Sequence, residues 1–253
     1  MGRPWKLTVR GVRGSVPTPA ADHLAYGGNT ACFTVDWDGG QAVLDAGTGL
    51  TGLTGAGPWH ILLSHLHMDH IAGLFGFAPL QDSTVHLYGP AGSRSLLEGL
   101  VGPPFWPVGL GQAVLHETAP GRSFPLPGGV EVSVLAGCHP NGSLLYRLTD
   151  GETCLVYALD CELAGDMAAR LTAFAQGADL LIWDAAFAPR DLRPGWGHST
   201  WAEGIALGRA AEVGQVLMTH YGPDYDDRSL QAQERLAHEA GGLFAREGMT
   251  IEL

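Results

Sequence analysis

The sequence predicts a strand-rich fold of mixed α and β structure, with the length common for a single two-sheet or barrel domain. Short apolar runs alternate with turn signals along the 253 residues, and 37 glycines with 16 prolines suit short strands and tight turns rather than long helices. Several predicted strands end at a residue that can bind a metal ion, and such residues converge on one rim of a packed pair of sheets. No linker, fixed-period repeat or low-complexity tract interrupts the pattern, so residues 1–253 are predicted to form one domain.

The first part of the chain is predicted to consist mainly of strands joined by glycine-rich loops. Strands are predicted at residues 6–12, 31–36, 41–45, 59–63 and 84–88, and a short helix at 92–100. Asp38-Gly39-Gly40, between the second and third strands, is typical of a hairpin turn. Prolines exclude regular structure from residues 101–107. The Phe105 and Trp106 rings there suit a pocket wall, an interface or a packed surface loop equally well.

Helices are more frequent in the second part of the chain. Strands are predicted at 130–136, 144–149, 153–159, 179–184, 215–219 and 249–253, and helices at 163–175, at 201–213 and from Asp226 or Asp227 to about 240. Gly177 suits the stop of the first of these helices. Thr200 and Glu203 match a capping box at the start of the second.

The overall charge argues against polyanionic partners. Asp and Glu number 26 against 14 Lys and Arg, and the net charge of −12 disfavours tRNA, DNA and anionic membrane surfaces. No apolar run reaches the roughly 18 residues that a membrane span needs, and no signal peptide is evident. The four cysteines form no Cys-x-x-Cys pair, which predicts reduced thiols in a cytoplasmic protein. Cys138 and Cys161 adjoin candidate metal ligands, so either could act as a further ligand.

A dense group of metal-competent residues lies between two apolar runs, at residues 59–63 and 71–75. The group comprises His65, His67, Asp69 and His70. In an extended segment, residues two apart point the same way, so His65 and His67 can share one metal ion. Asp69 and His70 lie where the chain turns toward a helix and can address a second ion. Imidazole and carboxylate ligands together suit zinc or a similar first-row ion.

Further metal-competent residues follow later predicted strands. His139, Asp160 and His220 each come directly after such a strand, and Asp184 is a further candidate at the end of another. One residue of this kind would be ordinary, since most buried histidines are only hydrogen-bonded. A series that begins with a dense cluster predicts a site for two metal ions instead.

These motifs carry a family resemblance that extends over nearly the whole chain. The His-x-His-x-Asp-His pattern of residues 65–70, preceded by Leu-Asp-Ala-Gly at 44–47, resembles the metallo-β-lactamase-fold hydrolases. His139, Asp160 and His220 then follow in the family's order. Three other segments resemble the branch of ribonuclease Z and the cyclic phosphodiesterases: Gly-Val-Arg-Gly-Ser at 11–15, Gly-Gly-Asn-Thr at 27–30 and Gly-His-Ser-Thr at 197–200.

The resemblance implies a specific fold and ligand set. The fold would be an α+β, four-layer αββα sandwich, the metallo-β-lactamase fold. One metal ion would be held by His65, His67 and His139, the other by Asp69, His70 and His220, and Asp160 would bridge them. The ions would be two divalent cations, zinc or alternatively manganese, and Asp45 would orient a ligand imidazole. Relatives are often dimers, so a homodimer is one option, and the sequence leaves the oligomeric state open.

Hydrolysis is the chemistry that this set predicts. Two cations about 3.5–4 Å apart can share a hydroxide that attacks phosphorus in line. His198 precedes a predicted helix N-terminus, where it could stabilise the developing charge or protonate the leaving oxygen. Asp184 is the candidate to orient His198. The predicted catalytic residues are therefore Asp69, as a metal ligand, together with His198 and Asp184.

The predicted function is that of a metal-dependent hydrolase, a phosphodiesterase acting on a small, linear or cyclic phosphodiester. Two alternatives remain, namely a lactonase or thioesterase on the same scaffold and a non-catalytic, metal-dependent ligand sensor. Tyr221-Gly222-Pro223-Asp224 follows His220, where related sequences continue with a second His and an Asp. Between residues 82 and 130 the only arginines are Arg94 and Arg122, with no basic arm of the kind that ribonuclease Z uses to grip tRNA. A small-molecule substrate is therefore predicted, and stable tRNA or DNA binding is not.

Overall fold

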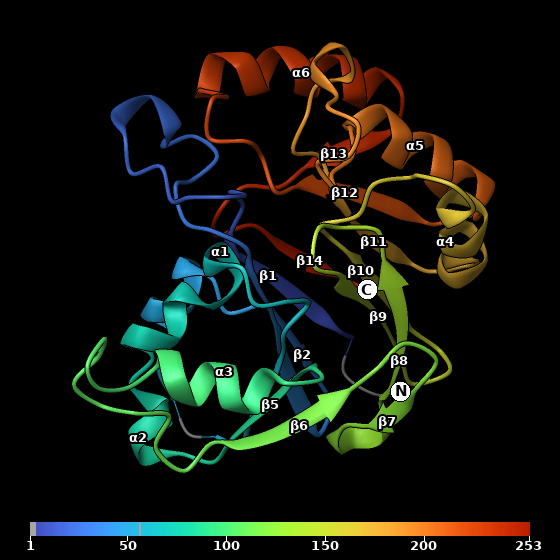
Figure 1. Cartoon of the computed structure of the whole chain (residues 1–253). Coiled ribbons are helices and arrows are strands. Elements are labelled where there is room, and N and C mark those ends of the chain that lie inside the picture. The colour runs from blue at the N-terminus through green and yellow to red at the C-terminus, as the bar shows by residue number, and fades with distance from the viewer. Residues whose placement is uncertain (1–3, 56) are drawn as a thin grey trace.

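The computed structural model describes residues 4–55 and 57–253. The first three residues, which belong to the N-terminal segment in which no signal peptide was evident, lie outside the described residues. Two seven-stranded sheets pack against each other, with order β14-β1-β2-β3-β4-β5-β6 in the first and β13-β12-β11-β10-β9-β8-β7 in the second. Helices α1, α2 and α3 lie on the side of the first sheet and α4, α5 and α6 on the side of the second (Figure 1). This arrangement confirms the predicted α+β sandwich.

The first sheet is built from the N-terminal part of the chain and its last strand. Its strands are β1 (Lys6–Gly11), β2 (Cys32–Trp37), β3 (Gly40–Leu44), β4 (Trp59–Leu62), β5 (Val85–Pro90), β6 (Val114–Thr118) and β14 (Thr250–Glu252). Its helices are α1 (Met68–Ile71), α2 (Pro79–Asp82) and α3 (Ser93–Leu100). The strands from β3 to β6 run parallel to one another, so their carboxyl ends lie at the same edge.

The second sheet repeats this plan. Its strands are β7 (Ser123–Pro125), β8 (Glu131–Gly137), β9 (Ser143–Thr149), β10 (Cys154–Ala158), β11 (Leu180–Asp184), β12 (Gln215–Thr219) and β13 (Gly242–Phe244). Its helices are α4 (Met167–Ala175), α5 (Trp201–Ala210) and α6 (Asp227–Glu239). The strands from β10 to β13 are parallel, and every residue of β10 and β11 is buried. Their uninterrupted apolar runs reflect packing on both faces.

The largest apolar cluster lies between the sheets and beneath the helices of the second sheet, where Phe33 meets Tyr157 edge to face at 5.8 Å. A second cluster lies between the first sheet and its helices, with Trp59 against Phe77 at 5.5 Å. Within the described part of the chain, no helix is both long and apolar enough to cross a membrane.

Most predicted elements are present, with a few differences at their ends. The helix predicted to start at residue 163 begins at Met167, because Gly165 adopts a positive φ of 61°. The helix predicted to run to residue 213 ends at Ala210, since Glu212 has a φ of 52°. The capping box of Thr200 and Glu203 is confirmed, and residues 101–107 contain neither helix nor strand.

Candidate metal centre

The predicted site residues lie at the carboxyl ends of strands from both sheets. Asp184 ends β11, the seven candidate ligands follow β4, β8, β10 and β12, and His198 lies in the loop that leads from β11 to α5. Asp45, Asp160 and His220, each just past a strand end, have positive φ values of 56°, 53° and 62°. This left-handed conformation costs a non-glycine residue about 1–2 kcal/mol. Such strain persists where the surrounding structure enforces it, and it is concentrated at functional sites.

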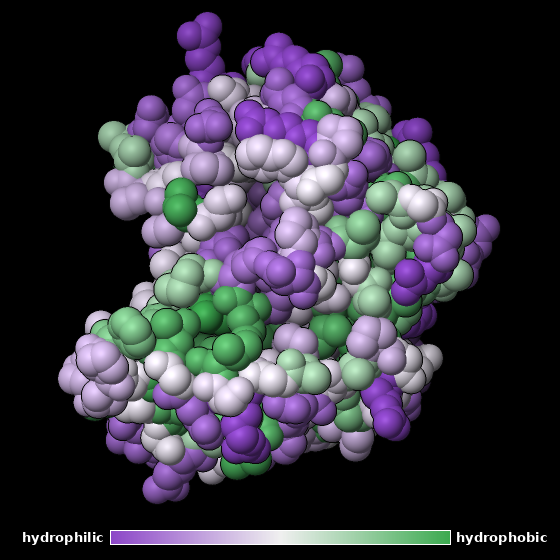
Figure 2. All heavy atoms as spheres, in the orientation of Figure 1, coloured by the Kyte–Doolittle hydropathy of each residue, from purple (hydrophilic) through white to green (hydrophobic). Residues whose placement is uncertain are grey.

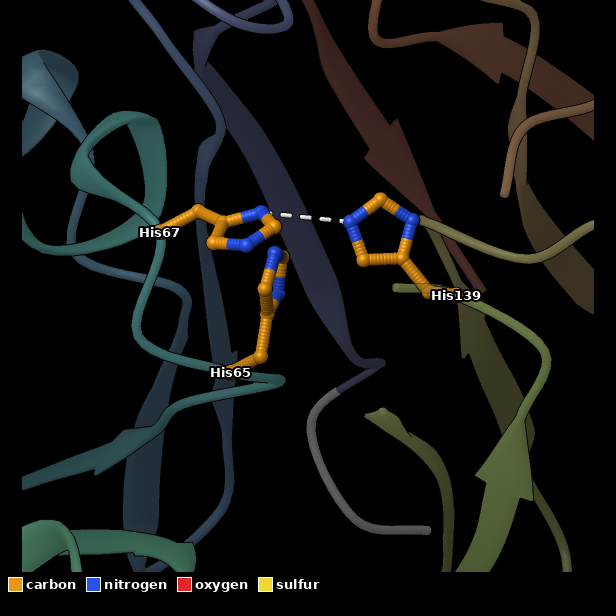
Figure 3. Close-up of side chains that lie close together, drawn as sticks. All are labelled: His65, His67 and His139. Atoms are coloured by element: carbon orange, nitrogen blue, oxygen red, sulfur yellow. Dashed lines mark hydrogen bonds between the residues drawn. The ribbon is translucent and has the colours of Figure 1, made fainter. Parts of the chain in front are cut away.

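The first group of candidate ligands comprises His65, His67 and His139, whose ring nitrogens lie within 4.8 Å of one another. His65 and His67 come from the loop between β4 and α1, and His139 from the loop after β8. Figure 3 shows the three rings pointing toward one another from these two loops. His67 Nδ1 and His139 Nε2 are 3.2 Å apart.

The second group comprises Asp69, His70 and His220, all of them buried. His70 Nε2 lies 3.2 Å from both Asp69 Oδ2 and His220 Nε2. Asp69 Oδ2 and His220 Nε2 are 3.4 Å apart. The short helix α1 carries Asp69 and His70, while His220 reaches the group from the second sheet. This group therefore joins the two halves of the sandwich.

Asp160 lies between the two groups, with one carboxylate oxygen facing each. Its Oδ1 is 3.8 Å from His65 Nε2 and 3.6 Å from His139 Nε2. Its Oδ2 is 3.1 Å from His70 Nε2 and 3.2 Å from His220 Nε2. This division of the two oxygens is the arrangement that a bridging carboxylate requires.

Polar contacts at Nδ1 orient two rings of the first group, those of His65 and His139, so that Nε2 faces the centre. Ser64 Oγ lies 3.0 Å from His65 Nδ1, and the Gly197 carbonyl lies 3.0 Å from His139 Nδ1. A carbonyl accepts only, so His139 carries its proton on Nδ1 and offers the lone pair of Nε2. Burial lowers the pKa of His139, and lowers that of His65 well below its usual range. The neutral imidazole, the form that binds metal ions, is thus favoured at both.

The second group is surrounded by negative charge. His70 Nδ1 donates to Asp45 Oδ2 at 2.7 Å, and the same oxygen accepts hydrogen bonds from Ser64 Oγ and Tyr157. Burial opposes protonation of His70, but the nearby carboxylates, with Asp160 the strongest, outweigh it and raise the pKa well above its usual range. At His220 burial likewise lowers the pKa, but the nearby carboxylates outweigh it, so that the pKa is raised. Positive charge is therefore strongly favoured here.

Two features of the centre suit divalent cations: its excess of buried carboxylates and its buried ligand atoms that lack a hydrogen-bond partner among the described residues. Its four buried carboxylates are Asp45, Asp69, Asp160 and Asp184. Among the described residues, only histidines lie within 4.0 Å of these carboxylates as cationic partners. His65 Nε2 and Asp160 Oδ2 are buried and, within the same residues, have no hydrogen-bond partner. Buried charges need compensation, and the spacing between ligand atoms resembles the roughly 3.3 Å of tetrahedral ligands about 2.0–2.1 Å from zinc.

His198 and Asp184 lie beside the second group, and His198 borders a pocket of about 470 Å³. His198 Nδ1 is 2.9 Å from Asp184 Oδ2, as the predicted orienting role requires. Burial lowers the pKa of His198, but Asp184 and more distant carboxylates outweigh it and raise the value to about 9. Phe187, Trp196 and Tyr225 line the pocket, which also reaches His220. Figure 2 shows the molecule hollowed on this face, with a hydrophobic patch along the lower rim.

Sequence reasoning missed several contacts of the site. The Ser15 backbone N–H donates to Asp69 Oδ2 at 2.6 Å, and Tyr157 reaches Asp45 from β10. A Cβ at Gly14 would lie 2.6 Å from the His220 ring, so only glycine fits there. The glycine loop at residues 11–15 was the one available signal, through its resemblance to the ribonuclease Z branch. No sequence pattern pointed to Tyr157, because its hydrogen bond to Asp45 depends on how the two sheets pack together.

Other residues left open by the sequence lie outside both groups. Cys138 and Cys161 join none of the metal-competent groups, and burial raises the pKa of Cys161 to about 12, which favours the thiol over the metal-binding thiolate. In the 101–107 loop, Trp106 packs against Phe75 with ring centroids 5.5 Å apart, whereas Phe105 is 68% exposed. The loop is thus packed on one side and open on the other.

Comparison with known proteins agrees with the fold. A profile described as "Beta-lactamase superfamily domain" matches residues 42–221. The chain therefore belongs to the β-lactamase superfamily, and it has the fold of the metallo-β-lactamase-fold hydrolases. The predicted family is confirmed.

Individual relatives support the ribonuclease Z-like branch. Ribonuclease Z of Haloferax volcanii is 26% identical over 308 aligned residues, covering 98% of this chain and 95% of the relative. The metallo-β-lactamase-fold protein YhfI of Bacillus subtilis superposes with a TM-score of 0.78 at 23% identity, covering 99% and 100% of the two chains. The short form of human tRNase Z gives a TM-score of 0.73 at 20% identity, covering 97% and 98%.

Proposed function

We propose that the protein is a dinuclear metal-dependent phosphodiesterase for a small linear or cyclic phosphodiester. His65, His67 and His139 would hold one ion and Asp69, His70 and His220 the other, with Asp160 shared. The histidine and carboxylate donors suit zinc, with manganese as the alternative. When bound, two such ions supply a hydroxide at neutral pH and neutralise charge at the attacked centre.

The position of His198 is the observation that carries the choice of phosphorus chemistry. Because Nδ1 is engaged by buried Asp184 at 2.9 Å, Nε2 is the ring nitrogen left to meet a substrate in the adjoining pocket. A protonated imidazole there can donate a hydrogen bond to a phosphoryl oxygen, or a proton to the leaving alkoxide. Asp184 holds the ring orientation and stabilises its positive charge. We assign His198 as the general acid and Asp184 as its positioning residue.

Charge and pocket size support a small substrate. The net charge of −12 disfavours binding of a polyanion. Although this chain is similar to a ribonuclease Z, it has no basic arm between residues 82 and 130. A pocket of about 470 Å³ lies within the range typical of small-molecule sites. Its aromatic lining and single arginine, Arg193, suit an organic group beside the scissile phosphate better than a nucleic-acid backbone.

The direct test is turnover of phosphodiesters by the purified protein. Bis-p-nitrophenyl phosphate and 3′,5′-cyclic nucleotides should be hydrolysed with added Zn²⁺ or Mn²⁺, and not after chelation. If no diester is hydrolysed under any metal condition, the proposal is wrong.

His198→Ala separates phosphodiester from carbonyl chemistry. The variant should bind both metal ions normally and lose about 10²–10⁴-fold in kcat on diesters, the usual contribution of a general acid. Leaving groups of low pKa should lose least, because they need no proton. If the variant keeps full diester turnover, or if lactones and thioesters are the better substrates, the role assigned to His198 is wrong. His238→Ala, in helix α6, is the matched control.

A further inference from the structure

Glu162, two residues after Asp160, binds the turn that leads to His198. Its Oε1 and Oε2 accept hydrogen bonds from the Gly195 N–H at 3.0 and 2.8 Å. Oε2 also accepts one from the Gly197 N–H at 3.0 Å. Hydrogen bonds to a carboxylate are stronger than those between neutral groups. The side chain thus ties together two segments 33 residues apart in sequence.

Glycines give the turn its carboxylate-binding shape. Gly195 and Gly197 have φ values of 83° and 81°, which direct both N–H groups to the same side as an anion-binding concavity. At Gly197 a Cβ would also lie 2.3 Å from His139 Nδ1. The turn can therefore approach the His139 ring only because residue 197 is glycine.

The same turn contacts two residues of the proposed active site. The Gly197 carbonyl accepts the hydrogen bond from His139 Nδ1 at 3.0 Å, and His198 is the next residue. On the other side, the Glu162 N–H donates to the Cys138 carbonyl at 2.9 Å, just before His139. Glu162 thus contacts the surroundings of His139 in two ways. Its backbone N–H binds the residue before His139, and its carboxylate binds the 195–197 turn whose carbonyl accepts from the His139 ring.

We propose that Glu162 is a positioning residue that sets the His139 imidazole for metal binding and places His198 beside the pocket. This inference rests on the proposed use of His139 and His198 at the metal centre. Without the carboxylate, two N–H groups of the turn lose their acceptor and the Gly197 carbonyl loses its fixed position. The His139 ring is then free to rotate or to change tautomer, and a cation in the first group loses a preorganised ligand.

The test compares two glutamates on either side of strand β10, Glu162 after it and Glu152 before it. Glu162→Ala removes the acceptor, Glu162→Gln keeps one oxygen, and Glu152→Ala changes an exposed glutamate before the strand as the matched control. Zinc affinity is measured by stepwise competition with a chromophoric chelator. In the metal-free protein, hydrogen exchange is measured over residues 195–199, and thermal unfolding confirms that each variant folds. None of these measurements requires turnover.

Glu162→Ala should weaken binding of one zinc ion by about 10–100-fold, the usual effect of losing a group that orients a ligand, and leave the other ion within about twofold. Exchange at residues 195–199 should accelerate in the metal-free variant. Glu162→Gln should fall between Glu162→Ala and the wild type, and remains informative if the alanine variant does not fold. Unchanged affinity for both ions would overturn the proposal, even with faster exchange, because Glu162 would then only anchor a surface turn. Absence of diester turnover would contradict the proposed function but not these binding results.

Discussion

The two groups of candidate ligands differ in burial and in charge, although they lie side by side. In the second group Asp69, His70 and His220 are 7%, 0% and 1% exposed, and Asp160 Oδ2 approaches to 3.1 Å. In the first group only His67 is open to solvent at its side chain, since the side chains of His65 and His139 are 5% and 3% exposed, and Asp160 Oδ1 stays 3.6–3.8 Å away.

This difference means that two neighbouring sites on one fold can bind cations with different affinities. Carboxylates concentrate negative charge in the second group and raise the pKa values of its histidines, whereas burial lowers the pKa values of His65 and His139 in the first group. We expect the second group to bind its ion more tightly and to join the two sheets. We expect the first group to exchange its ion more readily, because His67 is only partly buried and Asp160 lies farther from the ring nitrogens of this group.

The largest effect is expected from Asp160→Asn, which removes the charge shared by both groups. Metal binding to each group should weaken, and diester turnover should fall by about 10³-fold or more, since ion-dependent charge stabilisation amounts to several kcal/mol. Metal content after gel filtration and kcat/KM measure the two consequences. If only one ion is lost, Asp160 belongs to that group alone and does not bridge.

Single-histidine variants should affect the two groups differently. In the metal-free protein, His70→Ala should lower the free energy of unfolding by about 3 kcal/mol, because it leaves the carboxylate of Asp45 buried without its cationic partner. His67→Ala, at a partly buried position, should cost less than about 1 kcal/mol. Urea denaturation measures both. As a control, adding Asp45→Asn to His70→Ala should recover part of the loss, and no recovery would contradict this explanation.

The smallest effect concerns proton release on metal binding. Because the pKa values of His70 and His220 are raised, a cation competes with protons at these rings up to a higher pH than at an ordinary imidazole. Affinity for the second ion should therefore rise with pH until these groups are deprotonated. His65 and His139 have lowered pKa values, so the first ion should bind with little change above pH 7. Calorimetry in buffers of different ionisation enthalpy should give about one or two protons for one ion and near zero for the other. Equal proton release would remove the electrostatic distinction between the groups.

Much of the fold was predictable because its central strands are uninterrupted apolar runs that end at turn residues. Strands β10, β11 and β12 were expected almost to the residue, and so were the polar residues at their ends. Strands β6, β7 and β13 were missed, because they are edge strands of only three to five residues. Runs this short carry too little alternation of apolar and polar residues to mark a strand.

Within the site, the motif and the strand-end rule pointed to the seven candidate ligands and Asp184, and the Gly-His-Ser-Thr resemblance pointed to His198; the structure brings all of them close together. The residues that hold them were harder to predict. Asp45 was suggested by resemblance, but Ser15, Tyr157 and Glu162 act through hydrogen bonds between distant segments. A lone glutamate in a loop resembles any exposed acid until the turn that it binds is known.

The most direct test of the account is a titration of the metal-free protein with Zn²⁺ or Mn²⁺, with bis-p-nitrophenyl phosphate turnover followed at each addition. The account predicts negligible turnover without metal, and a rise that is complete at about two equivalents of the activating ion. Full activity at one equivalent, or turnover that persists after chelation, would contradict a dinuclear centre as the source of catalysis.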